Sequence, residues 1–255
     1  MLAELLPNQA FALLLVFVRL GSALMLMPGF GESYISPRIR LILALTVTVV
    51  VQPVLPQGVI PALPDSAMAM FLLILGEAFI GLFLGSLARV LMAALSTGGM
   101  MIATVTGLAN ALTNDPTAAQ QGSIAGSFLS TLALLIIIIL DLHHLLLRGV
   151  IESYELFVPG QSILVGDISQ MITRGVARAF LLGFQIASPF IAVGLIFNLG
   201  LGLLSRLMPQ MQVFFIAIPL QILIGMGILM IALPTLIGWF ISGFQDVMLP
   251  FAGLN

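Results

Sequence analysis

The stretch AMAMFLLILGEAFIGLFLGSLARVLMAALSTGGMMIA, residues 67–103, decides the fold class of this 255-residue chain. It holds two charged residues, Glu77 and Arg89, and no proline. A membrane-spanning helix needs about 20 apolar residues. The stretch is therefore too long for a simple span and too apolar for a helix that faces water. It predicts a long helix within a membrane protein.

The composition of the whole chain supports this class. It is 60% hydrophobic and 7% charged, with a mean hydropathy of +1.22, whereas soluble domains carry about 25% charged residues. A net charge of −2 gives no indication of a nucleic-acid partner. The absence of cysteine excludes disulfides, thiolate metal sites and a cysteine nucleophile.

Apolar regions recur along the chain and predict one all-α, membrane-embedded domain over residues 1–255. The regions lie at residues 9–28, 39–55, 67–103, 123–147, 176–204 and 211–243. Connections separate them at residues 29–40, 53–65 and 149–178, and the last of these turns helical from Asp167. Prolines within or at the ends of the apolar regions favour kinks, at Pro53, Pro189, Pro219 and Pro234.

Four charged residues interrupt the apolar regions: Arg19, Glu77, Arg89 and Asp141. A charge at mid-bilayer costs on the order of 3 kcal/mol or more, so it normally faces a partner or a water-filled space. Glu77 and Arg89 are about three turns apart on one helix, too far to pair directly. Any pairing must therefore be between helices or between chains. Three interpretations follow: the charges hold an assembly together, they relay protons or ions, or they do not lie in lipid.

No motif in the chain indicates an enzyme, a metal or a cofactor. Asp141, His143 and His144 form a cluster in DLHH. Asp141 and His144 could supply two metal ligands from one helix face, but the sequence offers no clear third, so we expect a helix end in polar surroundings. GxSxG, HExxH, P-loop and GxGxxG motifs are absent. Gly81xxxGly85 and Gly122xxxGly126 permit close helix contact.

A soft polar insert, GLANALTNDPTAAQQG at residues 107–122, separates the third and fourth apolar regions. Asn114, Asp115 and Pro116 are typical of a turn and helix start, which leaves a loop over residues 107–114. A loop of this kind is either a plain surface connection or a functional element. Its candidate residues are Gly107, Leu108, Ala109, Asn110, Ala111, Leu112, Thr113, Asn114, Asp115 and Pro116.

The stretch FNLGLGLLSRLMPQMQVFFIAIPLQILIG, residues 197–225, resembles the FliR family of flagellar export-apparatus proteins, relatives of the SctT components of virulence type III secretion. PGFGESYISPRIR after Arg19, and Glu77 with Gly81 and Gly85, also fit the family pattern. Gln212 stands where Asn is common, and Ala217 where Gly is common. The most distinctive part is a polar turn with Arg206, Pro209, Gln210 and Met211, followed by Phe214 and Pro219.

The resemblance implies a non-enzymatic, cofactor-free subunit of the FliP, FliQ and FliR core export gate, next to FlhB. It implies passage of unfolded flagellar proteins during type III secretion at the bacterial inner membrane, within the flagellar basal body. It also implies bent helical hairpins in a spiral raised towards the periplasmic side. In such a gate the polar insert would help to plug the closed channel.

Two other functions remain open. A secondary transporter or small-ion channel could use Arg19, Glu77, Arg89 and Asp141, although transporters favour two related halves and no internal repeat is evident. A purely structural membrane scaffold is the third alternative.

Overall fold

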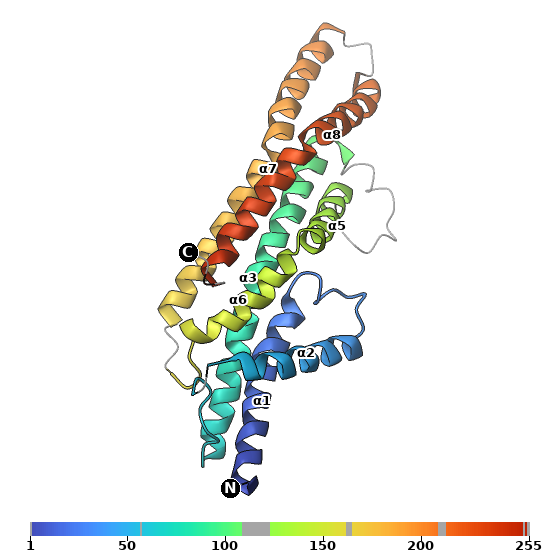
Figure 1. The fold of residues 1–255 in the computed structure, drawn as a ribbon. Coiled ribbons are helices and arrows are strands. Elements are labelled where there is room, and N and C mark those ends of the chain that lie inside the picture. The colour runs from blue at the N-terminus through green and yellow to red at the C-terminus, as the bar shows by residue number, and fades with distance from the viewer. Residues whose placement is uncertain are drawn as a thin grey trace. The chain divides into compact units, whose positions relative to one another are not determined.

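The computed structural model describes residues 2–56, 58–108, 123–161, 165–208, 213–251 and 253. These residues form helices and turns, with no strand among them, so the fold is all-α as predicted (Figure 1). The helices are α1 (Leu2–Leu26), α2 (Pro37–Val51), η1 (Gln52–Val54), α3 (Ala67–Val105), α5 (Ile124–Ile139), α6 (Leu142–Leu156), α7 (Val165–Leu207), α8 (Val213–Met248) and η2 (Leu249–Phe251).

Three helices are far longer than one membrane crossing requires. α3 has 39 residues, α7 has 43 and α8 has 36. At 1.5 Å per residue they measure about 54–65 Å, whereas the hydrocarbon core is about 30 Å thick. Among the described helices, five are long and apolar enough to cross a membrane, or six if the bent pair α5 and α6 is one span. The prediction of over-long apolar helices is confirmed.

The 74° bend between α5 and α6 lies within residues 123–147, which the sequence predicts to be one continuous apolar region. α5 and α6 are bent by 74° between Ile139 and Leu142, without a proline. α6 then runs through the start of the segment expected to be a connection, because its buried positions repeat with helical spacing, at Leu142, Leu146, Gly149, Val150, Ser153 and Tyr154. By contrast, α7 continues through Pro189, and α8 through Pro219 and Pro234.

The chain divides into two compact units. Unit 1 comprises Met1–Val90, Ile136–Gly175 and Phe244–Asn255. In unit 1, α1 lies against α2, α6 and the first part of α3. The most deeply buried α1 residues share one face of the helix, at Leu15, Val16, Arg19, Leu20 and Ala23. This face places one charged residue, Arg19, in the core of unit 1.

Gly81 and Gly85 allow α1 and α3 to touch. A Cβ at Gly81 would collide with the Arg19 carbonyl, and one at Gly85 would lie 2.7 Å from the Ala23 carbonyl oxygen. Only glycine admits a neighbouring backbone this closely. The close contact predicted for Gly81xxxGly85 is confirmed.

Unit 2 comprises Leu91–Leu135 and Val176–Gly243. Its core also depends on glycine, because Gly99 of α3 lies directly against the backbone of Gly126 of α5. Gly126 belongs to the second predicted glycine pair, and its partner Gly122 lies outside the described residues. Close helix packing is therefore observed at Gly126.

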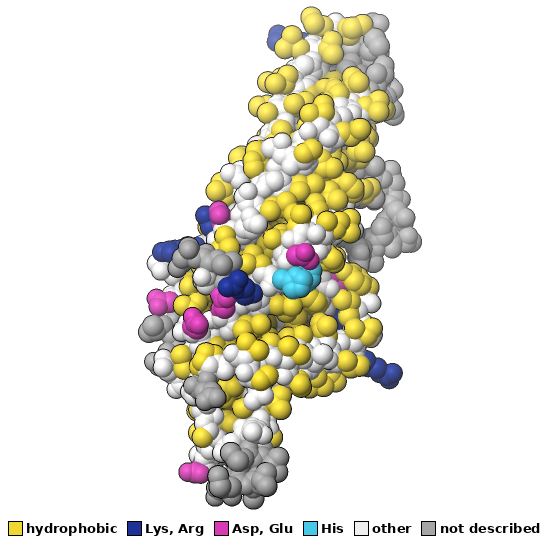
Figure 2. Space-filling view, viewed as in Figure 1, with side chains coloured by type: hydrophobic (Ala, Val, Ile, Leu, Met, Phe, Trp, Pro, Cys, Tyr) yellow, Lys and Arg dark blue, Asp and Glu magenta, His cyan; other side chains and the backbone are white. Residues whose placement is uncertain are grey.

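Hydrophobic side chains cover much of the face seen in Figure 2. Ile231 is 84% exposed and Met230 78% exposed, both on α8. An apolar surface of this extent suits lipid or other membrane helices rather than water.

Candidate functional site

Arg19 and Glu77 form a buried ion pair in the core of unit 1. Arg19 Nε donates to Glu77 Oε2 at 2.6 Å, and Nη2 donates to Oε1 at 2.8 Å. The exposed fractions of the two side chains are 0% and 2%. Both carboxylate oxygens are thus bound by one guanidinium, in the two-pronged geometry that favours arginine over lysine.

The remaining contacts of Arg19 come from α6 and the residue after it. Nη1 donates to Ser153 Oγ at 3.2 Å, and Nη2 donates to the Phe157 carbonyl at 2.8 Å. The Tyr154 ring lies 3.7 Å from the guanidinium carbon, a cation–π contact. One arginine therefore ties together α1, α3 and the end of α6.

The other two charges singled out in the sequence are exposed. Arg89, on α3, and Asp141, in the break between α5 and α6, interrupt apolar sequence but are not buried in the described structure. Asp141 Oδ1 lies 3.6 Å from His144 Nδ1. Of the four charges, the structure brings together Arg19 and Glu77 alone.

A groove of about 690 Å³ borders the ion pair in unit 1, with Glu77 in its wall. Most of the lining is apolar. It comes from α3, from the proline-rich connection at residues 53–65 and from the turn after α6, and includes Pro61, Pro64, Leu72, Ile80 and Pro159. Arg19 engages both carboxylate oxygens of Glu77, so this carboxylate is not free to bind an occupant of the groove. Asp167 is the other acidic residue in the lining.

The predicted plug segment begins in unit 2, where α3 ends at Val105. Gly107 has φ +76, in the left-handed region that favours glycine. The Gln221 side-chain amide on α8 donates to the Val105 carbonyl, and Thr106 packs against Gly225. The residues just before the predicted plug segment, Val105 and Thr106, are therefore held against α8. Residues 109–116 of the prediction lie outside the described residues.

Comparisons with known proteins agree over most of the chain. The family described as bacterial export proteins, family 1, matches residues 10–247. Flagellar biosynthetic protein FliR of Caulobacter vibrioides is 36% identical over 207 residues, which cover 81% of this chain and 82% of that protein. The FliR of Bacillus subtilis is 31% identical over 206 residues, covering 80% and 78%. The chain belongs to the FliR family.

As a member of the FliR family, the chain is a flagellar export component and a membrane protein of the flagellar export apparatus. The matched range includes the buried pair Arg19 and Glu77 as well as Gly107 and Arg206. The resemblance inferred from the sequence is confirmed.

The turn that carries the FliR resemblance connects α7 and α8. Arg206 is exposed in the last turn of α7, and Pro219 is exposed within α8. Phe214 lies in the first turn of α8, where side chains are not described. Pro209 and Gln210 lie outside the described residues.

Three residues that complete the Arg19 site were not predicted from the sequence: Ser153, Tyr154 and Phe157. They fall in the segment expected to be a connection. The spacing of Leu142, Leu146 and Val150 could have extended the helix to them, since these residues lie on one helical face.

Proposed function

We propose that this FliR family member joins FliP and FliQ in the core export gate of the flagellar basal body, beside FlhB. In this proposal, unfolded flagellar proteins cross the bacterial inner membrane through the gate. The helices act as bent hairpins in a spiral raised towards the periplasmic side. Family membership carries the proposal.

The exposed faces of α7 and α8 support a role within an assembly. No charged residue occurs between Leu207 and Gln245, and Leu203 and Leu223 are 66% and 69% exposed. In a membrane, helices of this kind associate through close packing rather than through charge. Neighbouring apolar helices and lipid are the occupants that fit these faces.

Co-purification tests the proposal. The chain would be expressed with and without FliP and FliQ of the same organism and extracted in mild detergent. We expect a defined complex on co-expression and a polydisperse product when the chain is alone. A stable, monodisperse chain that retains neither partner would contradict the gate proposal.

The alternative, a secondary transporter or small-ion channel, has less support. It would use Arg19, Glu77, Arg89 and Asp141, yet Arg19 and Glu77 are fully buried and bound to each other. A titrating or moving charge would first have to break these contacts. Substrate uptake by the isolated chain in liposomes would favour this alternative over the gate.

We further propose that the segment from Gly107 to Pro116 fills the channel of the closed gate. Its residues are small or neutral except Asp115, so they can occupy a lumen without a strong charge to retain a passing polypeptide. The anchored end of α3 would hold the segment in place.

A deletion of residues 109–118 tests the plug. We expect the deletion variant to retain FliP and FliQ but to leak small ions across the membrane. An equal-length replacement by Gly and Ser is the matched control, and it should restore much of the seal, since it is also small and neutral. Unchanged conductance of an assembled deletion variant would rule out the plug.

A further inference from the structure

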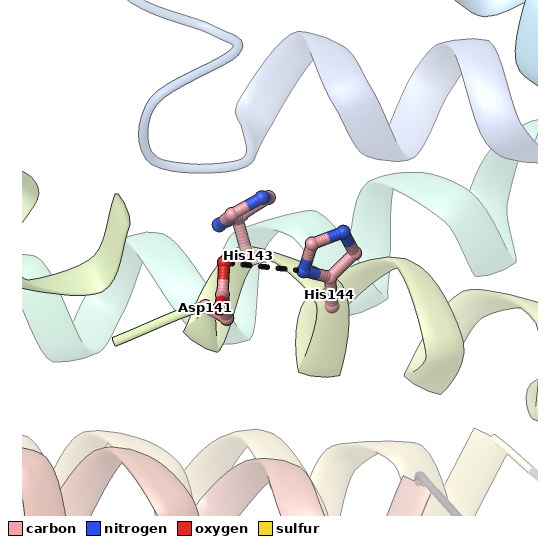
Figure 3. A group of neighbouring side chains, drawn as sticks. All are labelled: Asp141, His143 and His144. Atoms are coloured by element: carbon pink, nitrogen blue, oxygen red, sulfur yellow. Dashed lines mark ion pairs between the residues drawn. The ribbon is translucent and has the colours of Figure 1, made fainter. Parts of the chain in front are cut away.

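Both histidines of this protein lie in one place. The chain has two histidines and no cysteine, and His143 and His144 stand beside Asp141 at the break between α5 and α6. One potential ligand atom from each of the three side chains lies within 4.8 Å of the other two. Figure 3 shows the carboxylate next to both imidazole rings. The fold thus brings His143 close enough to Asp141 and His144 to be the third ligand, which the helical spacing of the sequence did not show.

The backbone at Asp141 is left-handed. With φ 56, Asp141 is the one non-glycine residue of positive φ among the described residues. Aspartate and asparagine tolerate this conformation better than other residues that carry a side chain. Asp141 also occupies the N-cap position of α6, yet its side chain makes no capping hydrogen bond, although aspartate is among the best caps. The carboxylate faces the imidazoles instead.

The polar atoms of the cluster lack hydrogen bonds to one another. His143 Nδ1 is buried without a partner among the described residues. The 3.6 Å separation of Asp141 Oδ1 and His144 Nδ1 is too long for a hydrogen bond. The two rings lie with their centroids 4.1 Å apart. His143 Nδ1 is thus the one buried atom of the cluster without a hydrogen-bond partner among the described residues, and a bound ion would satisfy it.

We propose that Asp141, His143 and His144 bind a late first-row divalent cation, represented by Zn²⁺. Two imidazoles and one carboxylate suit Zn²⁺, Ni²⁺ or Cu²⁺, whereas Mg²⁺ and Ca²⁺ prefer oxygen ligands alone. Tetrahedral Zn²⁺ places its ligand atoms about 3.4 Å apart, so small side-chain rotations within the 4.8 Å cluster close the site.

The cluster is exposed at the surface, so a bound ion would be accessible to water and to other chains. Asp141 and His144 are 75% and 70% exposed, and Figure 2 shows histidine and acidic side chains together at the surface. Three protein ligands leave a fourth position for water or for a group from another chain. An ion held here would link the break residue Asp141 to the first turn of α6.

Metal titration of the full-length chain tests this site. The chain would carry a tag without histidine and be studied in detergent or nanodiscs, with Co²⁺ followed by its visible absorption and then displaced by Zn²⁺. We expect one tight ion per chain with a tetrahedral Co²⁺ spectrum. His143→Gln and His144→Gln should each weaken binding by at least about tenfold.

Asp141→Asn and Asp65→Asn provide matched variants. Asparagine tolerates the left-handed conformation, so Asp141→Asn removes the charged ligand without straining the break, and binding should weaken. Asp65 belongs to the proline-rich connection rather than to the cluster, so Asp65→Asn should bind like the wild type. Equal affinity in the wild type and both histidine variants, or an octahedral spectrum alone, would indicate adventitious ions only and overturn the proposal. Neither readout depends on gate assembly.

Discussion

Arg19 on α1 donates two hydrogen bonds, of 2.6 and 2.8 Å, to the carboxylate of Glu77 on α3, although the two residues are 58 positions apart in the sequence. The exposed fraction of each side chain is 2% or less. A buried pair of this kind gives little net stability relative to apolar residues, but the loss of one partner leaves an uncompensated charge. The pair therefore specifies how α1 and α3 meet in unit 1. Removal of one charged partner should cost more stability than removal of both.

Glu77→Gln should destabilise the chain by about 3–5 kcal/mol, because Arg19 keeps its charge without a counter-ion. Removal of both charges, with Arg19→Met and Glu77→Leu, should recover part of this loss. Thermal unfolding in detergent measures both changes. Arg148→Gln, which breaks the more exposed ion pair with Glu152 on α6, is the control and should cost less than about 1 kcal/mol. A double variant less stable than Glu77→Gln would contradict this account.

Tyr154 should contribute through its ring, which lies 3.7 Å from the Arg19 guanidinium carbon. Tyr154→Phe keeps the ring and should change stability by less than about 1 kcal/mol. Tyr154→Leu removes the cation–π contact and should cost about 2 kcal/mol or more. If thermal unfolding shows equal losses for both variants, the hydroxyl rather than the ring face is the important group.

Gly81→Ala should displace α1 from α3, because the added methyl group meets the Arg19 backbone and the Ser22 side chain. We expect a loss of at least about 2 kcal/mol from overpacking and a lower level of folded chain in membranes. Gly227→Ala is the matched control on α8, where a Cβ meets no atom within 4 Å. That change should be neutral or stabilising by up to about 1 kcal/mol. Equal tolerance of both alanines would show that α1 and α3 do not need this contact.

Gln221→Met should loosen the end of α3, since it removes the amide that donates to the Val105 carbonyl. If the segment after Gly107 seals the gate, this variant should leak ions, though less than the deletion of residues 109–118. Conductance of the assembled gate in planar bilayers measures the effect. Gln185→Met, at an exposed position of α7, should leave the seal intact. Leakage of equal size in both variants would show that the hydrogen bond from Gln221 to the end of α3 does not contribute to sealing the gate.

The long apolar stretches predicted the helices well but not their faces. Glu77 and Arg89 lie on the same helix, α3, and sequence alone treats them alike, yet Glu77 is buried and Arg89 is exposed. Because nearly every turn of α3 is apolar on all sides, its periodicity does not indicate which side meets another helix. α6 is different, since its buried residues repeat at helical spacing, and that pattern could have predicted the helix through Tyr154.

The turn that carries the FliR resemblance is a second case in which the sequence predicted an element but not its tertiary contacts. Its residues, from Arg206 to Pro219, were the most distinctive part of the resemblance to the FliR family and placed a connection between two long helices. They did not indicate that Gln221, two residues further along, reaches the carbonyl of Val105. That contact depends on how α8 lies against α3 within unit 2.

The sequence by itself determined the membrane class, the all-α fold, the over-long helices and the family, because these follow from composition, run length and local motifs. The tertiary structure alone decided that Arg19 pairs with Glu77 and that Ser153, Tyr154 and Phe157 complete the site. It also decided that the chain bends at Asp141 and brings His143 beside it. These features join or orient residues through packing. Gly81 and Gly85 mark a contact face on α3, and the spacing of α6 marks its buried face, but the sequence does not specify which helix meets each face.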